Sequence, residues 1–304
     1  MTLLSLFVAL VLQQFWPAGA GSLAGRLGRG FVAWFERRVQ ASTGAGGRTA
    51  WLLVVPATAL ASAVVYGMLW SLHPLLAFLF NVAVLFAGMG FARDSRFFNE
   101  VHVALRMGDP DGARALLSDW RGVRHDAATT GEVARLSIEQ ALVAAHRSVF
   151  GVIFWFVLLP GPSGVVLYRL AALLAVGRAV QSGACDGFAQ RVFLALDWLP
   201  ARLTALVFSV VGNFEDAVYC WRSQAVLWPE RSSAILIASG GGALGVRLGG
   251  PIHEAGALVE RPEMGLGGEA GVDHMQGTVG LLWRALLVCL FLLALLAVAG
   301  AAGG

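Results

Sequence analysis

The sequence predicts an all-α fold, a polytopic membrane bundle of about five helical spans with amphipathic helices at the cytoplasmic surface. Composition is the first reason: 57% of the 304 residues are hydrophobic and only 13% are charged, whereas soluble domains carry about 25% charged residues. The second reason is the apolar run 279–299, whose only charge is Arg284. A run of this length can cross the roughly 30 Å hydrocarbon core of a bilayer as one helix.

The N-terminal third contains further apolar runs. Residues 1–16 are short for a span, so we expect an uncleaved first helix that is tilted or lies partly in the interface. Residues 17–48 form an arginine-rich connector, in which 27–39 has the spacing of an amphipathic helix on the membrane surface. Residues 51–70 and 74–91 then predict a tight transmembrane hairpin.

A long polar stretch follows at residues 93–147, with arginines and acids in equal number. Three helices are expected in it, at residues 94–107, 110–120 and 130–146. Thr129 and Glu132 have the spacing of a capping box, which predicts that the third helix starts at residue 130. Because charges of both signs interleave along the stretch, we expect its helices to present a solvated face.

The second half of the chain is harder to interpret. Residues 149–159 and 165–180 flank a Pro/Gly-rich turn and are each short for a span, so they form either two short tilted helices or a re-entrant hairpin.

We expect five segments: 1–92 with N-terminal membrane helices and an amphipathic connector, 93–148 as a cytoplasmic helical segment, 149–212 with central membrane or re-entrant helices, 213–278 as a polar glycine-rich segment, and 279–304 as a C-terminal membrane helix. The arginine-rich segments 17–48 and 93–147 should face the cytoplasm.

Residue usage excludes several functions. All 22 basic residues are arginine, and without lysine neither a pyridoxal Schiff base nor a phosphate-loop nucleotide site can form. The net charge is only +3, and the arginines flank apolar segments, so membrane topology explains them better than nucleic-acid binding. The three cysteines lie far apart and the histidines show no ligand spacing, so neither a disulfide framework nor a metal site is predicted.

Two constellations stand out. Asp197 and Arg202 lie in the otherwise apolar run 192–211, where charges are costly and therefore indicate a functional site. They form either an internal ion pair, or a site in which Arg202 binds a carboxylate or phosphate and Asp197 orients it. The glycines at 240–245, followed by Arg247, allow either close packing or the approach of a ligand to the backbone.

Several motifs resemble one known family. They are Leu-Pro-Ala-Arg-Leu at 199–203, Gly-Ala-Leu-Gly-Val-Arg-Leu-Gly-Gly-Pro at 242–251, Tyr168-Arg169, and Val-Glu-Arg-Pro at 259–262. On these residues the chain resembles the CobD/CbiB family of cobalamin biosynthesis, over most of residues 90–290. The central block, from Leu196-Asp-Trp198 to Trp221, is also similar to AmpE, a related membrane protein linked to β-lactamase regulation.

The CobD/CbiB resemblance implies an amide-forming step that joins aminopropanol or its phosphate to adenosylcobyric acid. If the chain is active, it would be an amide ligase of the adenosylcobinamide-phosphate synthase type, with ATP and Mg²⁺ as cofactors. Near 146–150, where the family carries acid and amide residues, this chain has His146-Arg-Ser-Val-Phe150. The acids that could substitute are Asp94, Asp197 and Asp273. The AmpE resemblance implies the alternative, a non-catalytic membrane regulator or sensor.

The residues expected to bind substrate are Arg169, Arg202 and Arg247 of these motifs, Arg191, which the resemblance implies as a further polar residue of the family's set, and the acid Asp197. Their ligand would be a corrinoid or another anionic small molecule. No catalytic residue and no metal ligand is singled out. The expected partners are membrane lipid and this ligand, without nucleic acid, and the expected location is the bacterial inner (cytoplasmic) membrane, as a multi-pass protein.

Overall fold

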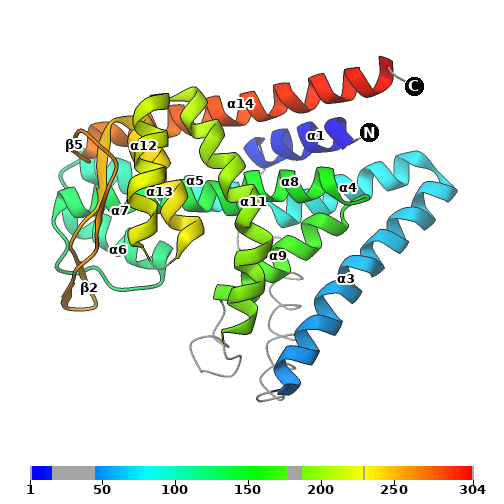
Figure 1. Cartoon of the computed structure of the whole chain (residues 1–304), viewed down its shortest axis with the longest axis horizontal. Coiled ribbons are helices and arrows are strands. Elements are labelled where there is room, and N and C mark those ends of the chain that lie inside the picture. Colours follow the sequence, from blue (N-terminus) through cyan, green and yellow to red (C-terminus); the bar gives the residue numbers. More distant parts are fainter. Residues whose placement is uncertain (1, 16–44, 177–186, 229, 303–304) are drawn as a thin grey trace. The chain divides into compact units, whose positions relative to one another are not determined.

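The computed structural model describes residues 2–15, 45–176, 187–228 and 230–302 (Figure 1). The chain divides into two compact units, each built from two stretches of sequence. Unit 1 comprises Met1–Ala92 and Arg147–Trp198, and unit 2 comprises Arg93–His146 and Leu199–Gly304. The amphipathic helix predicted at 27–39 lies outside the described residues.

Unit 1 consists of helices (Figure 1). They are α1 (Thr2–Phe15), α3 (Ala45–Leu72), α4 (Pro74–Gly88), α8 (Gly151–Leu158), α9 (Ser163–Val176) and the first part of α11 (Phe188–Val211). The predicted hairpin of α3 and α4 is confirmed. Its turn is set by His73, whose Nδ1 accepts the Leu75 N–H at 3.1 Å, and by Pro74 at the first helical position, where its missing N–H removes no hydrogen bond.

Two contacts hold the other helices of unit 1 against this hairpin. The Gln13 side chain of α1 donates to the carbonyl oxygens of Phe86 at 3.1 Å and Met89 at 2.8 Å, which satisfies acceptors that the end of α4 leaves open. The turn between α8 and α9 has Gly161 at φ +60, and a Cβ there would lie 2.6 Å from the Tyr66 ring of α3. The turn therefore packs closely on α3 only because residue 161 is glycine.

Unit 2 combines helices with a few short strands. Its helices are most of α5 (Phe91–Arg106), α6 (Pro110–Arg121), α7 (Thr130–Ala145), the end of α11, α12 (Phe214–Gln224), α13 (Arg231–Leu244) and α14 (Val272–Ala302), with a 3₁₀ turn η2 (Ala225–Leu227). A π-helix, η1 (His146–Phe150), joins α7 to α8. The predicted capping box is present: the Glu132 N–H reaches Thr129 Oγ1 and the Thr129 N–H reaches Glu132 Oε2.

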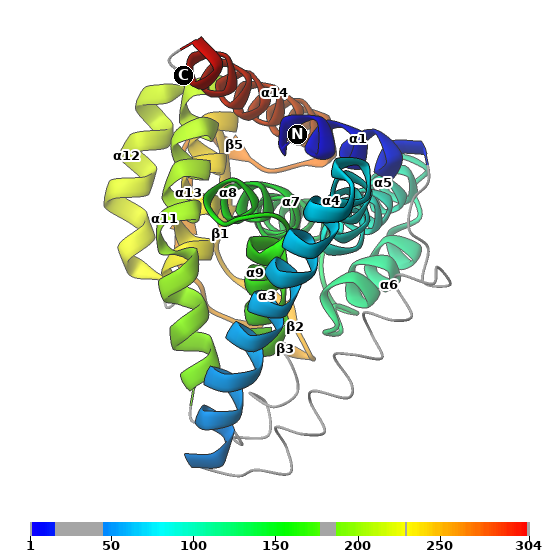
Figure 2. The ribbon, with the colours of Figure 1, turned by 90° about the vertical axis from the view of Figure 1, so that its right-hand side faces the viewer.

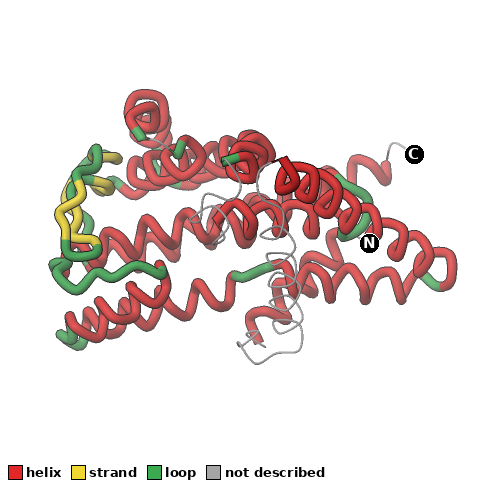
Figure 3. The backbone as a smooth tube through the Cα atoms, turned by 90° about the horizontal axis from the view of Figure 1, so that it is seen from below, coloured by secondary structure: helices red, strands yellow, loops and turns green. Residues whose placement is uncertain are grey.

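The strands were not predicted. β1 (Val246–Gly249) pairs antiparallel with β4 (Glu263–Met264), with Leu248 opposite Met264, and parallel with β5 (Gly268–Glu269). β2 (Ile252–Glu254) and β3 (Ala257–Val259) form a separate antiparallel hairpin. Figure 3 shows these strands gathered together within an otherwise helical chain, so the all-α class is confirmed.

The glycines at 240–242 serve close packing. They lie in the buried helix α13, which runs beside α12 (Figure 2). A Cβ at Gly242 would lie 2.6 Å from the carbonyl oxygen of Asp216 in α12, and one at Gly240 would lie 2.5 Å from Leu142 in α7. Glycine is required at 242, because a side chain there would push α13 away from the backbone of α12. At 240 a side chain would displace the end of the Leu142 side chain.

Five helices are long and apolar enough to cross a membrane: Trp51–Leu72, Pro74–Arg106, Thr130–Leu158, Phe188–Val211 and Val272–Gly300. The count agrees with the sequence, but the set differs. The first apolar run forms only the short helix Thr2–Gln14, and Thr130–Leu158 takes its place. In that helix 67% of the most apolar window is buried inside the protein, against 11% in Trp51–Leu72.

The burial of α7 corrects the expectation of a solvated face. Val133, Leu136, Ile138 and Leu142 are all fully buried, and the polar residues Ser137 and Glu139 are buried with them. The prediction of a solvated face was wrong for α7 because it treated the charges of residues 93–147 as evenly spread over three helices. Most of them lie on α5, α6 and the loop that follows, whereas the charged residues of α7 are only Glu132, Arg135 and Glu139.

Candidate functional site

The first polar cluster lies in unit 1 and is called the Tyr168 cluster: Arg147, Tyr168, Arg169, Phe193 and Asp197. The Tyr168 hydroxyl donates to Asp197 Oδ1 at 2.7 Å, and both side chains are fully buried. The two residues come from α9 and α11, which are apolar helices. A carboxylate in such surroundings is stabilised by a hydrogen-bond donor, because an unpaired one would be very costly.

Two arginines complete the Tyr168 cluster. Arg169 Nη1 donates to the backbone carbonyl of Arg147 at 3.3 Å, and the Arg147 guanidinium lies 5.7 Å from the centre of the Phe193 ring, a cation–π distance. Arg147 belongs to the π-helix η1, a type of turn that occurs mostly as a local bulge and often at functional sites. Both arginines are close enough to the Tyr168 side chain for their charges to act on it.

A glycine makes room for this arrangement. A Cβ at Gly151 of α8 would overlap the Tyr168 ring and hydroxyl. Gly88, at the end of α4, lies against α9 in the same way, with Arg169 Cγ 3.8 Å from where its Cβ would be. Small residues on two neighbouring helices therefore let Tyr168 and Arg169 lie inside the helix packing.

Unit 1 holds three of the predicted substrate-binding residues, and two of them come together. Arg169 and Asp197 are both in the Tyr168 cluster. Arg191 is exposed. It precedes Asp197 by six residues on α11, so it lies about 120° around the helix from that carboxylate.

The other two predicted residues lie in unit 2 and are half-exposed or exposed. Arg202 lies near Arg231, so that the two positive charges repel each other. Arg247 of β1 is 3.9 Å from Glu263 and 4.0 Å from Glu269, on the exposed side of the small sheet. Two residues after Arg202, the buried Thr204 Oγ1 lies 2.9 Å from Nδ1 of the buried His146.

The second polar cluster lies in unit 2 and is called the Glu139 cluster: Arg135, Glu139, Trp228, Gly249 and Arg261. Arg261 binds Glu139 with both terminal nitrogens, at 2.9 Å to Oε2 and 3.2 Å to Oε1. The Gly249 N–H also donates to Glu139 Oε1, at 2.8 Å. Arg261 is stacked 5.0 Å over the Trp228 ring. A bidentate ion pair that is almost completely buried is a strong and geometrically specific contact.

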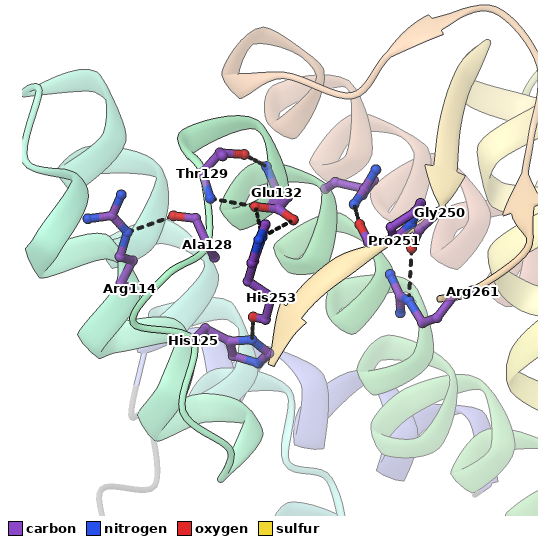
Figure 4. A network of polar contacts seen from close by, with 10 residues as sticks. Arg114, His125, Ala128, Thr129, Glu132, Gly250, Pro251, His253 and Arg261 are labelled. Carbon is purple, nitrogen blue, oxygen red and sulfur yellow. Dashed lines mark hydrogen bonds and ion pairs between the residues drawn. The ribbon is translucent and has the colours of Figure 1, made fainter. Parts of the chain in front are cut away.

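The same two arginines hold the turn between β1 and β2. Arg261 Nε donates to the carbonyl of Gly250 at 3.2 Å, and Arg135 donates to the carbonyl of Pro251 (Figure 4). Gly249 and Gly250 both have positive φ, near +70. The motif at 242–251 and the motif at 259–262 thus meet on one helix, α7.

A third set of contacts ties the β2–β3 hairpin to the start of α7. His253 Nδ1 lies 3.1 Å from Glu132 Oε1, the acid of the capping box, while the His253 carbonyl accepts from His125 Nδ1 at 3.2 Å (Figure 4). Because a carbonyl can only accept, His125 Nδ1 carries the proton and Nε2 is the acceptor in the neutral ring. Burial lowers the pKa of His125, and the nearby charge of Arg121 lowers it further.

The sequence missed Glu139, Arg261, Tyr168 and Arg147 as site residues. Glu139 carried a usable signal, because it is an acid in a helix whose other residues from Leu136 to Ala145 are mostly apolar, the kind of position that singled out Asp197. Arg261 and Tyr168 appeared only as parts of the family motifs. Nothing in the local sequence marks Arg147 as a site residue, because it is the last residue of the polar stretch 93–147, in which arginines are common.

A magnesium–nucleotide would need several carboxylate oxygens in one place. In the part of the chain that the structure describes, no group of three or more His, Cys, Asp or Glu side chains is placed to hold a metal. Asp94 accepts from Trp120 Nε1 at 3.1 Å in unit 2, Asp197 is bound by Tyr168 in unit 1, and Asp273 lies in the first turn of α14. The described residues do not fit Mg²⁺ and ATP, and no step is assigned to them.

The apolar helices and the polar clusters within them define a multi-pass helical membrane protein. Comparison with known proteins then identifies the family of membrane proteins to which the chain is similar. A family model described as CobD/Cbib protein matches residues 18–282. The cobalamin biosynthesis protein CobD of Stutzerimonas stutzeri (strain A1501) is 34% identical over 271 residues, which cover 85% of this chain and 86% of that protein.

Two further relatives agree. The cobalamin biosynthesis protein CobD of Chromobacterium violaceum is 37% identical over 205 residues, covering 65% of each chain, and the cobalamin biosynthesis protein CbiB of Salmonella arizonae is 29% identical, covering 96% of each. No solved structure matches the chain. The chain belongs to the CobD/CbiB family.

Proposed function

We propose that this chain acts in cobalamin biosynthesis in the bacterial inner (cytoplasmic) membrane, where it binds a corrinoid or the phosphate-bearing donor of its side chain. The Tyr168 cluster carries the proposal. It places two arginines and a tyrosine-bound carboxylate among apolar helices, and such groups are retained at membrane depth chiefly for function. The names of the relatives, cobalamin biosynthesis proteins CobD and CbiB, support the pathway.

The proposed ligand-binding residues fall into two groups. In unit 1 they are Arg169, Arg191 and Asp197, of which Arg169 supplies positive charge and Asp197 fixes the neighbouring hydroxyl. In unit 2 they are Arg202 and Arg247. A guanidinium binds carboxylate and phosphate oxygens bidentately, which suits an anionic corrinoid side chain or its phosphate-bearing partner.

Complementation tests the proposal. The chain is expressed in a CbiB-null strain that needs cobalamin, and growth is measured without added cobalamin but with cobyric acid and aminopropanol. Growth would support an amide-forming enzyme of the adenosylcobinamide-phosphate synthase type. No growth, with the full-length protein verified in the inner-membrane fraction, would contradict it.

One observation favours a second candidate, a non-catalytic AmpE-like membrane regulator. The two fully or nearly fully buried carboxylates of the described chain are already engaged, Glu139 by Arg261 and Gly249, and Asp197 by Tyr168. A ligase needs carboxylates that face its metal and nucleotide. Altered β-lactamase induction on deletion of the gene, together with failed complementation, would favour the regulator.

The inner-membrane location has its own test. Fusions of alkaline phosphatase and of green fluorescent protein are made after residue 48, in the loop at 107–109 and at the C-terminus. If 17–48 and 93–147 are cytoplasmic, the first two sites should give fluorescence and no phosphatase activity. Phosphatase activity at either site would contradict the proposed orientation.

A further inference from the structure

Unit 2 exposes large apolar side chains along one continuous stretch of chain, from the end of α11 to η2. The relative exposure of these residues lies between 42% and 65%. Single exposed apolar residues are normal, whereas a contiguous group of them marks an interaction surface. We call this group the 199–227 surface, and its members are Leu199, Leu203, Leu206, Val210, Phe214, Tyr219, Val226 and Leu227.

The part of this surface that belongs to α11 has the character of a lipid-facing helix side. α11 is one of the five helices that are long and apolar enough to cross a membrane. Within Leu199–Val211 the exposed side chains are apolar and recur at intervals of three or four residues, while Arg202 is half-buried. That spacing places the exposed side chains on one face of the helix, which suits contact with acyl chains.

The next helix, α12, is held at both ends, so the direction of its exposed face is fixed. At its start the N–H of Asn213 donates to the carbonyl of Ala243 in α13 at 3.1 Å. At its end the side chain of Gln224 exchanges two hydrogen bonds with the backbone of Gly265, at 2.7 and 3.2 Å. Because both ends are tied to unit 2, α12 cannot rotate to bury Tyr219 inside the unit.

The exposed face of α12 and η2 is mixed, unlike that of α11. Beside the apolar side chains that it contributes to the 199–227 surface, it exposes the charged residues Glu215 and Arg222. Such charges are costly in hydrocarbon, and exposed apolar side chains are unfavourable in water. The headgroup region of a bilayer accommodates both kinds, and a tyrosine, with its apolar ring and polar tip, is enriched there.

We propose that α12 and η2 lie in the headgroup region of the bilayer, where a lipid surface covers their part of the 199–227 surface. Continuity with α11 supports lipid as the occupant. Phe214 follows Val210 by four residues, which span at most about 14 Å of chain. The apolar face of α12 therefore begins close to the lipid-facing side of α11. The proposal goes beyond the proposed function and does not depend on it.

Fluorescence quenching by lipid tests the proposal. Leu227→Cys is made in the full-length Cys185→Ser, Cys289→Ser protein, labelled with a nitrobenzoxadiazole fluorophore and placed in nanodiscs that each hold one copy. The lipids carry a nitroxide either near the glycerol end or near the methyl end of the acyl chain. An interfacial helix sinks only about 5–10 Å below the headgroups, so the glycerol-end nitroxide should quench at least about twice as strongly as the methyl-end one.

Two matched labels calibrate the depth. Leu287→Cys lies exposed near the middle of the span Val272–Gly300, so the methyl-end nitroxide should quench it more strongly. Glu260→Cys replaces an exposed charged residue of the same unit and supplies the reference for a label in water. The same protein without an added cysteine gives the background from Cys220.

Two results would overturn the proposal. Quenching of the Leu227 label no stronger than that of the Glu260 label would show that lipid does not cover α12 and η2. Stronger quenching by the methyl-end nitroxide would place them within the hydrocarbon instead. If the first result is accompanied by energy transfer between donor- and acceptor-labelled copies in vesicles, a second copy of the chain covers the surface. If Leu227→Cys does not fold, Tyr219→Cys, also exposed, carries the same expectation.

Discussion

Glu139 and Arg261 are 122 residues apart in the sequence and form a bidentate ion pair in unit 2, with N–O distances of 2.9 and 3.2 Å. The side chains are only 3% and 12% exposed. The pair links α7 to the segment that precedes β4, and the Gly249 N–H binds the same carboxylate. The segments 242–251 and 259–262 are thereby both fixed to one buried acid.

The first prediction concerns this acid. Glu139→Gln should destabilise the protein by about 3 kcal/mol, because it leaves the Arg261 guanidinium buried beside a neutral amide. The measurement is the shift of the thermal unfolding midpoint in detergent. Glu260→Gln makes the same change at an exposed position and should leave the midpoint within error. Equal midpoints for both variants would show that the pair contributes little.

The second prediction concerns the glycine below Tyr168. Gly151→Ala should lower stability by about 1–3 kcal/mol, since the added methyl group overlaps the Tyr168 ring and hydroxyl. The matched control is Gly131→Ala, in the first turn of α7, where nothing lies within 4 Å of the new Cβ. There alanine should be neutral or stabilising. Unfolding of both variants is followed by circular dichroism, and a stable Gly151→Ala would refute the close contact.

The third prediction is a pH dependence. Burial lowers the pKa of His125 from 6.5, and Arg121 adds to this effect, whereas the His253 carbonyl and Glu254 act in the opposite direction. A histidine whose pKa is lowered on folding binds its proton more readily when unfolded, so stability is complete above about pH 6.5 and falls as the pH drops below it.

The measurement is the unfolding midpoint between pH 7.5 and 5. In His125→Asn, which has no titrating ring, the decline over this range should be smaller, although stability at pH 7.5 is also lower through loss of the contact with the His253 carbonyl. A slope unchanged by His125→Asn would contradict the assignment.

The fourth prediction concerns Cys220 of α12. Its thiol is fully buried, and burial raises the pKa to about 11, so thiolate is scarce at neutral pH and alkylation should be slow. In a Cys185→Ser, Cys289→Ser background, N-ethylmaleimide should label Cys220 only after denaturation. An added Glu260→Cys, at an exposed position, should be labelled in the native protein. Rapid native labelling of Cys220 would contradict its burial.

The fifth prediction concerns Arg202, a proposed ligand residue in unit 2. Arg202→Ala should abolish growth in the complementation assay, because it removes a positive charge that is proposed to bind the anionic ligand. Arg48→Ala, an exposed arginine, serves as the control and should grow. Wild-type growth of Arg202→Ala, with equal amounts in the membrane, would contradict a role of Arg202 in ligand binding.

Much of the fold could be predicted because its signals are local. The hairpin at His73, the helix start at Thr129 and the final span depend on runs and spacings of fewer than about 25 residues. The same holds for Asp197 as a buried acid, which stands out within its own helix. The burial of most of α7 and the short strands at 246–269 were missed, because their environment comes from segments far away in the chain.

For the candidate site, too, the residues could be predicted from local sequence, whereas the contacts between them could not. Arg169 and Asp197 were named from their sequence neighbourhood, while their link through Tyr168, and the nearness of Arg147, required the packing of α8, α9 and α11 around Gly151. The division into five segments and the joint use of Arg169, Arg191, Arg202 and Arg247 stay predictions. No local pattern encodes which side chains of separate helices will meet.

By itself, the sequence determined that this is a helical membrane protein of the CobD/CbiB kind, since the lengths of apolar runs and short motifs are properties of contiguous residues. Only the tertiary structure decided that Glu139 meets Arg261 and that Tyr168 meets Asp197. Such pairs form when helices pack and water is excluded, and the free energy of a buried charge depends on what the whole fold brings beside it.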